Sequence, residues 1–169
     1  MNFKHCPDCG APLSSRILGD EGEVPWCDRC GKPWFPVFPV AAICLVHNEM
    51  GEVLLLRQNY ISEVYRNLVS GYVTPGERCE ETACREIEEE TGLRPQSVRL
   101  KGTWWFEKKQ MMMVGFFAEV EKAPLRLSEE VDEASWHSPQ EAVSLVHPYP
   151  YSVSRILSEM YLNSLKKEI

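Results

Sequence analysis

Residues 71–93 place a cluster of acidic side chains on a predicted helix that follows a Pro-Gly turn. Glu86, Glu89 and Glu90 recur at offsets of three and four, which bring side chains to one face of an α-helix. Like charges at this spacing repel and cost roughly 0.2–0.5 kcal/mol per pair. A bound divalent cation reverses that repulsion, and carboxylate oxygens are ligands that Mg²⁺ and Mn²⁺ prefer. The cluster therefore indicates a metal site, with a solvated acidic face as the alternative interpretation.

The spacing around this cluster is more specific than its acidity. The segment reads GYVTPGERCEETACREIEEETGL from Gly71 to Leu93. In this segment, five residues separate Gly71 from Glu77, and seven residues separate Glu77 from Arg85-Glu86-Ile87. Glu89-Glu90 follows after one residue, and Gly92-Leu93 after one more. This pattern resembles the Nudix box at every defined position. The resemblance implies hydrolysis of a nucleoside diphosphate that is linked to another group, with divalent metal on the box helix.

A second set of residues with metal-ligand spacing lies near the N-terminus. Cys6-x-x-Cys9 and Cys27-x-x-Cys30 are separated by 17 residues. Two such pairs are typical of a closed, tetrahedral structural zinc site with four thiolates. Disulfides are the alternative, but the opening MNFKHCPDCG lacks the apolar core of a secretory signal, and a reducing cytosol is expected. We expect one structural Zn²⁺ in a cytoplasmic protein.

Composition limits the classes of partner. The 169 residues are 44% hydrophobic and 25% charged, as in soluble globular proteins, and no apolar run is long enough to span a membrane. A net charge of −7 argues against a broad nucleic-acid surface, which would need to be basic. A small basic patch in the cysteine-rich segment keeps a nucleic-acid-binding ribbon as an alternative; its members are Lys4, Arg16, Arg29 and Lys32.

Hydrophobic patterns and turn residues predict the order of elements. Strands are expected over 37–46, 52–58, 67–73, 97–106, 111–120 and 134–137. Helices are expected over 79–91, from 139 onward after the Ser138 cap, and over 151–167. This order indicates a mixed sheet flanked by helices. With the resemblance, it implies a Nudix-type α/β/α sandwich, an α/β fold, over 36–169 after a zinc ribbon over 1–35.

The resemblance extends beyond the box. A four-cysteine ribbon directly before a Nudix domain is similar to the NADH pyrophosphatase group, as is Trp34-Phe35-Pro36. Where that group carries Ser-Gln-Pro-Trp, this chain has Gly-Thr-Trp-Trp, and only Trp105 matches; Thr74 replaces the usual Glu. An NAD(H)-type dinucleotide, cleaved to two mononucleotides, is the leading expectation. ADP-ribose, a dinucleoside polyphosphate and NAD-capped RNA are alternatives, as is a non-catalytic nucleotide sensor.

Metal bound by the helix would neutralise phosphate charge and activate water. Glu86 and Glu90, one turn apart, are expected to bind Mg²⁺ or Mn²⁺ directly, and Glu89 to bind a second ion or act as the general base. Arg85 and Glu77 are expected to orient the box, with an ordinary salt bridge as the alternative. By resemblance, the Ser70 carbonyl and Glu130 complete the metal shell, and the enzyme is a homodimer.

Substrate contacts are expected at aromatic residues and at backbone near the phosphates. By resemblance, Phe35 stacks on the nucleobase and Ser154 contacts the substrate. Trp105 and Phe106 are candidates for the same pocket, with core packing as the alternative for both. Gly71 is expected to let the backbone approach the phosphates.

Overall fold

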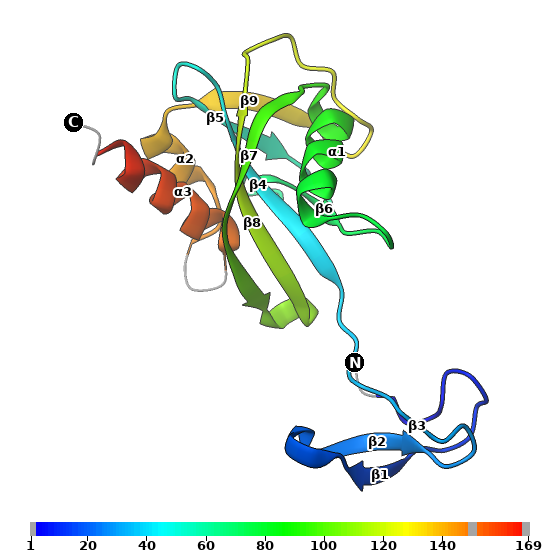
Figure 1. Cartoon of the computed structure of the whole chain (residues 1–169). Coiled ribbons are helices and arrows are strands. Elements are labelled where there is room, and N and C mark those ends of the chain that lie inside the picture. Colours follow the sequence, from blue (N-terminus) through cyan, green and yellow to red (C-terminus); the bar gives the residue numbers. More distant parts are fainter. Residues whose placement is uncertain (1–2, 149–151, 167–169) are drawn as a thin grey trace. The chain divides into compact units, whose positions relative to one another are not determined.

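The computed structural model describes residues 3–148 and 152–166, which group into two compact units, Met1–Phe38 and Pro39–Ile169 (Figure 1). This division lies close to the boundary at 35/36 that the sequence predicts. None of the described helices is long and apolar enough to cross a lipid bilayer.

The first unit is a small antiparallel sheet with little hydrophobic core. Its strands pair in the order β1 (Ser14–Ile17), β2 (Glu23–Cys27) and β3 (Lys32–Pro33), with a 3-10 turn, Gly19–Glu21, between the first two. Among the described residues, its buried apolar side chains are Cys6, Val24 and Cys27. So small a core rarely stabilises a fold alone, and metal binding commonly supplies the difference.

The second unit is built on a six-stranded mixed sheet of order β7-β8-β4-β5-β9, with β6 pairing on β4. Its strands are β4 (Val40–His47), β5 (Val53–Arg57), β6 (Val69–Tyr72), β7 (Pro95–Phe106), β8 (Met111–Val120) and β9 (Glu133–His137). The β4–β8 pair is parallel and the other pairs are antiparallel. The sheet and its helices confirm the predicted α/β fold class.

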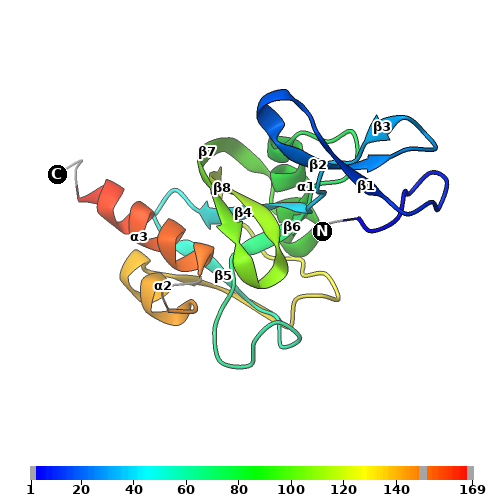
Figure 2. The same cartoon turned by 90° about the horizontal axis from the view of Figure 1, so that it is seen from below.

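The helices cover both faces of this sheet (Figures 1 and 2). They are α1 (Cys79–Thr91), α2 (Pro139–Leu145) and α3 (Val153–Leu165); Glu107–Lys109 form a 3-10 turn between β7 and β8. Residues of β4 alternate between two cores: Ile43 belongs to the core under α2 and α3, and Cys44 to the core under α1. Burial on both faces explains why this strand reads as a nearly continuous apolar run.

Several boundaries differ from the sequence prediction by a few residues, and the largest difference is at the start of β4. The strand expected over 37–46 begins only at Val40, because Pro39 has no N–H to donate to the sheet ladder. The helix expected over 151–167 is α3, but Tyr151 and Lys167 lie outside the described residues. The predicted Ser138 cap is confirmed, since its hydroxyl accepts a hydrogen bond from the N–H of Glu141 at 3.3 Å.

The aromatic residues of β7 divide between two environments. Trp104 and Phe106 pack against the core under α2 and α3. A Cβ at Gly115 would overlap the Trp104 ring, so the missing side chain makes room for it. Trp105 lies 44% exposed, and its indole N–H donates to Glu107 at 2.7 Å. Trp104 is therefore a packing residue.

Candidate functional site

The carboxylate of Glu86 lies against the backbone of strand β6. A Cβ added at Gly71 would overlap that carboxylate, so only glycine permits the close approach. Ala83 and Ile87 are fully buried on the inner face of α1 and fix the rotation of the helix. Close packing of α1 on β6 therefore sets the position of Glu86.

Arg85 joins three carboxylates of the box. Its Nε lies 2.7 Å from Glu77 Oε1, and its Nη1 lies 2.7 Å from Glu86 Oε1 and 3.0 Å from Glu89 Oε2. Its Nη2 also donates to the carbonyl of Tyr72 at 3.2 Å. The Arg85 guanidinium holds the pKa of Glu77 well below its usual range. Arg85 therefore forms more than an ordinary pairwise salt bridge, because its single guanidinium group contacts carboxylates from both ends of the box.

Glu90 is the buried member of the acidic cluster. Its side chain is 3% exposed, and Oε1 accepts a hydrogen bond from Gln58 Nε2 at 2.9 Å. Oε2 has no hydrogen-bond partner among the described residues. Burial and the neighbouring Glu86 raise the pKa of Glu90 to about 8. A buried carboxylate with an unpaired oxygen beside a second carboxylate suits a proton or a hard cation, so this donor set fits Mg²⁺ or Mn²⁺.

An open cavity of about 1390 Å³ lies beside the cluster. The predicted site residues that line it are Ser70, Gly71, Arg85, Glu86, Glu89, Glu90, Phe106, Glu130 and Ser154. Glu130 is also close enough to raise the pKa of Glu90. Trp105 and Glu77 are not among the described lining residues, and Phe35 belongs to the first unit.

Sequence reasoning missed one wall of this cavity. The loop after β5 contributes Tyr60, Ile61 and Tyr65, and the tip of the β7–β8 hairpin contributes Lys108 and Lys109. His147 also lines the cavity, and the centroid of its ring lies 4.7 Å from that of Tyr65. No local motif marks these residues, because long-range pairing of the chain brings them together.

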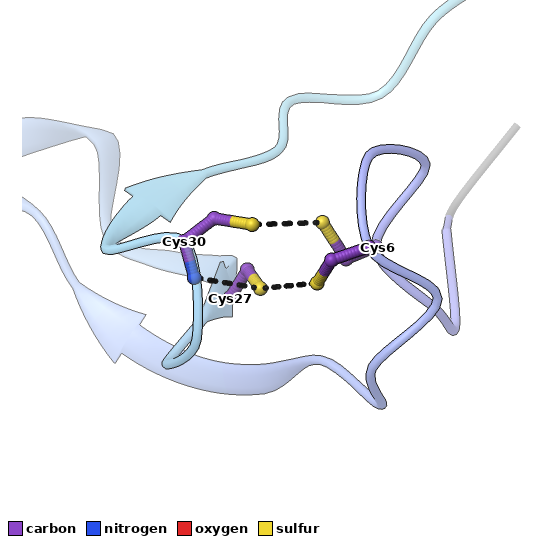
Figure 3. A group of neighbouring side chains, drawn as sticks. Cys6, Cys27 and Cys30 are labelled. Atoms are coloured by element: carbon purple, nitrogen blue, oxygen red, sulfur yellow. Dashed lines mark hydrogen bonds between the residues drawn. The ribbon is translucent and has the colours of Figure 1, made fainter.

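The four predicted cysteines converge in the first unit. Figure 3 labels three of them, Cys6, Cys27 and Cys30. The Sγ atoms of all four lie within 4.8 Å of one another, with Cys6–Cys30 at 3.8 Å and Cys9–Cys27 at 3.6 Å. A tetrahedral ion with Zn–S bonds of ~2.3 Å separates its sulfurs by ~3.8 Å, whereas a disulfide needs ~2.05 Å. The cluster therefore has the geometry of a four-thiolate metal site.

Two of the four cations in the small basic patch of the first unit, Arg16 and Lys32, pair with carboxylates. Arg16 lies 2.6 Å from Asp28, and Lys32 lies 2.6 Å from Asp8. The same two cations also stand over Trp26 and Trp34. Paired charges attract phosphates weakly, so this surface gives little support to the nucleic-acid-binding alternative.

The raised pKa of Glu90 predicts an unusual pH dependence of stability. Below pH ~4.5 the carboxyl is protonated in both the folded and the unfolded protein. As the pH rises towards about 8, the unfolded state loses this proton first, so stability falls through that window. Without Mg²⁺ or Mn²⁺, Glu90→Gln should raise the melting temperature at pH 8 by roughly 2–4 °C or more. Thermal unfolding at pH 5 and pH 8 tests this, and an equal or lower melting temperature of the variant at pH 8 contradicts it.

Comparison with known proteins places the chain in a family. The model of the NUDIX domain matches residues 37–157, and the chain belongs to that family. It is 32% identical over 164 residues to a protein of Stutzerimonas stutzeri named NAD-capped RNA hydrolase NudC, covering 94% of this chain and 56% of that protein. A protein of the same name from Chromobacterium violaceum is 29% identical over 159 residues, covering 92% and 57%. The chain thus spans about half the length of these relatives.

Solved structures agree on the fold. A NUDIX hydrolase from Nitrosomonas europaea superposes with a TM-score of 0.71 at 20% identity, covering 97% of this chain and 93% of that one. A MutT protein from Methanosarcina mazei Go1 gives a TM-score of 0.60 at 27% identity, covering 79% and 99%. The first likeness spans nearly the whole chain and supports the fold class.

Proposed function

We propose that this chain is a metal-dependent hydrolase that cleaves the pyrophosphate bond of a nucleoside diphosphate derivative. One observation carries the proposal: Glu86, Glu90 and Glu130 come together at a large cavity, and buried Glu90 keeps one oxygen without a protein partner among the described residues. Such a cluster is unfavourable unless a cation or a proton binds to it. Two anionic phosphates and their metal ions need this combination of acidic ligands and open space.

The proposed mechanism assigns each box residue one task. Glu86 and Glu90, with Glu130 and the Ser70 carbonyl, hold divalent cations. These ions, when bound, neutralise phosphate charge and lower the pKa of the attacking water. Arg85 and Glu77 keep the carboxylates aligned through the hydrogen bonds described above.

We assign Glu89 the role of general base. Its side chain is 58% exposed at the cavity, whereas that of Glu86 is 15% exposed. Among the described residues, the carboxylate of Glu89 accepts a hydrogen bond from Arg85, and it can turn towards a water near the phosphates. The alternative, in which Glu89 binds a second ion, is distinguished by metal affinity.

The proposed substrate is an NAD-type dinucleotide, cleaved to two mononucleotides. The names of the relatives favour an NAD cap on RNA as one form of it. Lys108 and Lys109 at the cavity rim make no ion pair with a described carboxylate and would suit additional phosphates. Gly71, Phe106 and Ser154 line the cavity and are proposed substrate contacts, to which we add Phe35 and Trp105.

We also propose how the protein is held together and where it works. One zinc ion on the four cysteines stabilises the residues before 36 as a zinc ribbon, and the remainder forms the hydrolase domain. Four thiolates stay available to metal in a reducing compartment, which is consistent with the cytoplasm. A homodimer is proposed from the family resemblance, and light scattering of the purified protein tests it.

A substrate panel tests the proposed activity. The protein with Mn²⁺ should cleave NADH or NAD to two mononucleotides, and ADP-ribose, a dinucleoside polyphosphate and NAD-capped RNA provide the comparison. Products are identified by mass spectrometry. Nucleotide binding without turnover of any substrate would reject the enzyme and favour a nucleotide sensor.

A further inference from the structure

We propose that Gln58 is a positioning residue for the metal centre: its side-chain amide holds one oxygen of Glu90 and so presents the other oxygen to a divalent cation. This inference rests on the proposed function, and it concerns a residue that lies outside the box. Gln58 follows strand β5 directly and is 1% exposed, an unusual place for a polar side chain.

The side-chain amide of Gln58 hydrogen-bonds only one of the two carboxylate oxygens of Glu90. Gln58 Nε2 donates to Glu90 Oε1 at 2.9 Å and lies 3.4 Å from the hydroxyl oxygen of Tyr60. An amide nitrogen carries two hydrogens, and these two contacts use both of them. Glu90 Oε2 has no hydrogen-bond partner in the described part of the chain. One oxygen is therefore anchored, and the other remains available as a ligand.

The charge of Glu90 selects the orientation of this amide. When Glu90 is ionised, as a metal ligand is, a reversed amide would place Gln58 Oε1 against a carboxylate oxygen, and two acceptors cannot share a hydrogen bond. An ionised, metal-binding Glu90 therefore requires Nε2 on its side. A methionine at this position would have similar length and no donor, so it would leave the carboxylate free to turn.

The backbone holds Gln58 in place from several directions. Its carbonyl accepts hydrogen bonds from the N–H groups of Ile61 at 2.8 Å and Ser62 at 3.0 Å. The N–H of Asn59 donates to Asp132 Oδ2 at 2.7 Å. A donor fixed in this way is already aligned before metal binds, which is how residues behind a metal ligand orient it.

Gln58 is also a poor choice if its only role is structural. Its Oε1 is buried and has no hydrogen-bond partner among the described residues, and such groups destabilise a fold. An apolar side chain of the same shape would remove this unpaired oxygen but would leave the buried Glu90 Oε1 without its donor. The polar residue at this position is explained by its effect on Glu90.

The test is the affinity of Gln58→Met for Mn²⁺, measured by calorimetry on the zinc-loaded protein. Loss of a residue that orients a ligand typically weakens metal binding by about 10–100-fold. We expect a loss of Mn²⁺ affinity in that range and turnover that recovers at high Mn²⁺. The melting temperature without Mn²⁺ should fall, because methionine leaves the buried Glu90 Oε1 without a donor. Wild-type Mn²⁺ affinity in the variant would overturn the assignment, and so would an equal loss of Mn²⁺ affinity in the destabilised control variant described next.

Asn48→Ala is the matched control. Asn48 is another buried amide, 2% exposed, but it hydrogen-bonds Glu52 and the backbone of the β4–β5 turn. Its loss should lower the melting temperature and leave Mn²⁺ affinity unchanged. A Gln58→Met/Glu90→Gln double variant should bind Mn²⁺ as weakly as Glu90→Gln alone; a further tenfold loss would mean that Gln58 does not act through Glu90. Absence of Mn²⁺ binding by the wild type would instead reject the proposed metal centre itself.

Discussion

Glu89→Gln is expected to lower kcat for the dinucleotide by about 10²–10⁴-fold, the usual contribution of a general base. The amide has the shape of the carboxylate but cannot take a proton from the attacking water. The Mn²⁺ affinity of the Glu89→Gln variant should stay within about threefold of that of the wild type, because Glu86 and Glu90 are the proposed direct ligands. Steady-state kinetics and a Mn²⁺ titration on the same preparation measure both quantities.

Glu88→Gln provides the control for this prediction. Glu88 lies on the same helix, 53% exposed, and pairs with Arg94 at 3.0 Å. Its substitution should leave kcat and Mn²⁺ affinity unchanged. Full activity of Glu89→Gln would remove Glu89 from the mechanism. A parallel fall in metal affinity and kcat would make it a metal ligand and not the base.

Cys27→Ala is expected to unfold the first unit while the sheet of the second unit stays intact. Cys27 is fully buried at the end of β2, and its Sγ belongs to the four-cysteine cluster. Zinc binding contributes about 10–16 kcal/mol in comparable small metal sites, and few other buried side chains of this unit could replace it. Hydrogen exchange should show lost protection over residues 3–38 only.

Elemental analysis supplies the second readout. Wild-type protein should carry about one zinc per chain, and the variant none. Cys44→Ala serves as the control, since Cys44 is fully buried in β4 and outside the cluster. It should retain zinc. A zinc-free wild type would refute the ribbon, as would a Cys27→Ala protein with normal protection over residues 3–38.

The ends of the box helix are predictable because their signals are local. Helix α1 spans Cys79–Thr91 as the sequence indicates, and Gly92 ends it in the left-handed conformation at φ 74°. The Ser138 cap of α2 is equally local. The acidic face is predictable from helical spacing alone, and Glu86, Glu89 and Glu90 all line the cavity.

The features that sequence reasoning missed depend on contacts between distant segments. The hydrogen bond from Gln58 to Glu90 spans 32 residues of sequence, and helix α1, which carries Glu90, packs on β6. Sequence spacing also cannot show that Trp105 and Phe106 lie in different environments. Phe106 lines the cavity, whereas the indole of Trp105 binds Glu107.

The most direct test of the central claim is product analysis with NAD and Mn²⁺, comparing wild type with Glu89→Gln. The account predicts NMN and AMP in equal amounts from the wild type, no products when Mn²⁺ and Mg²⁺ are omitted, and at least about 10²-fold slower release from the variant. It would be contradicted by intact NAD after prolonged incubation together with intact ADP-ribose, dinucleoside polyphosphate and NAD-capped RNA. Cleavage that continues without divalent metal would contradict it as well.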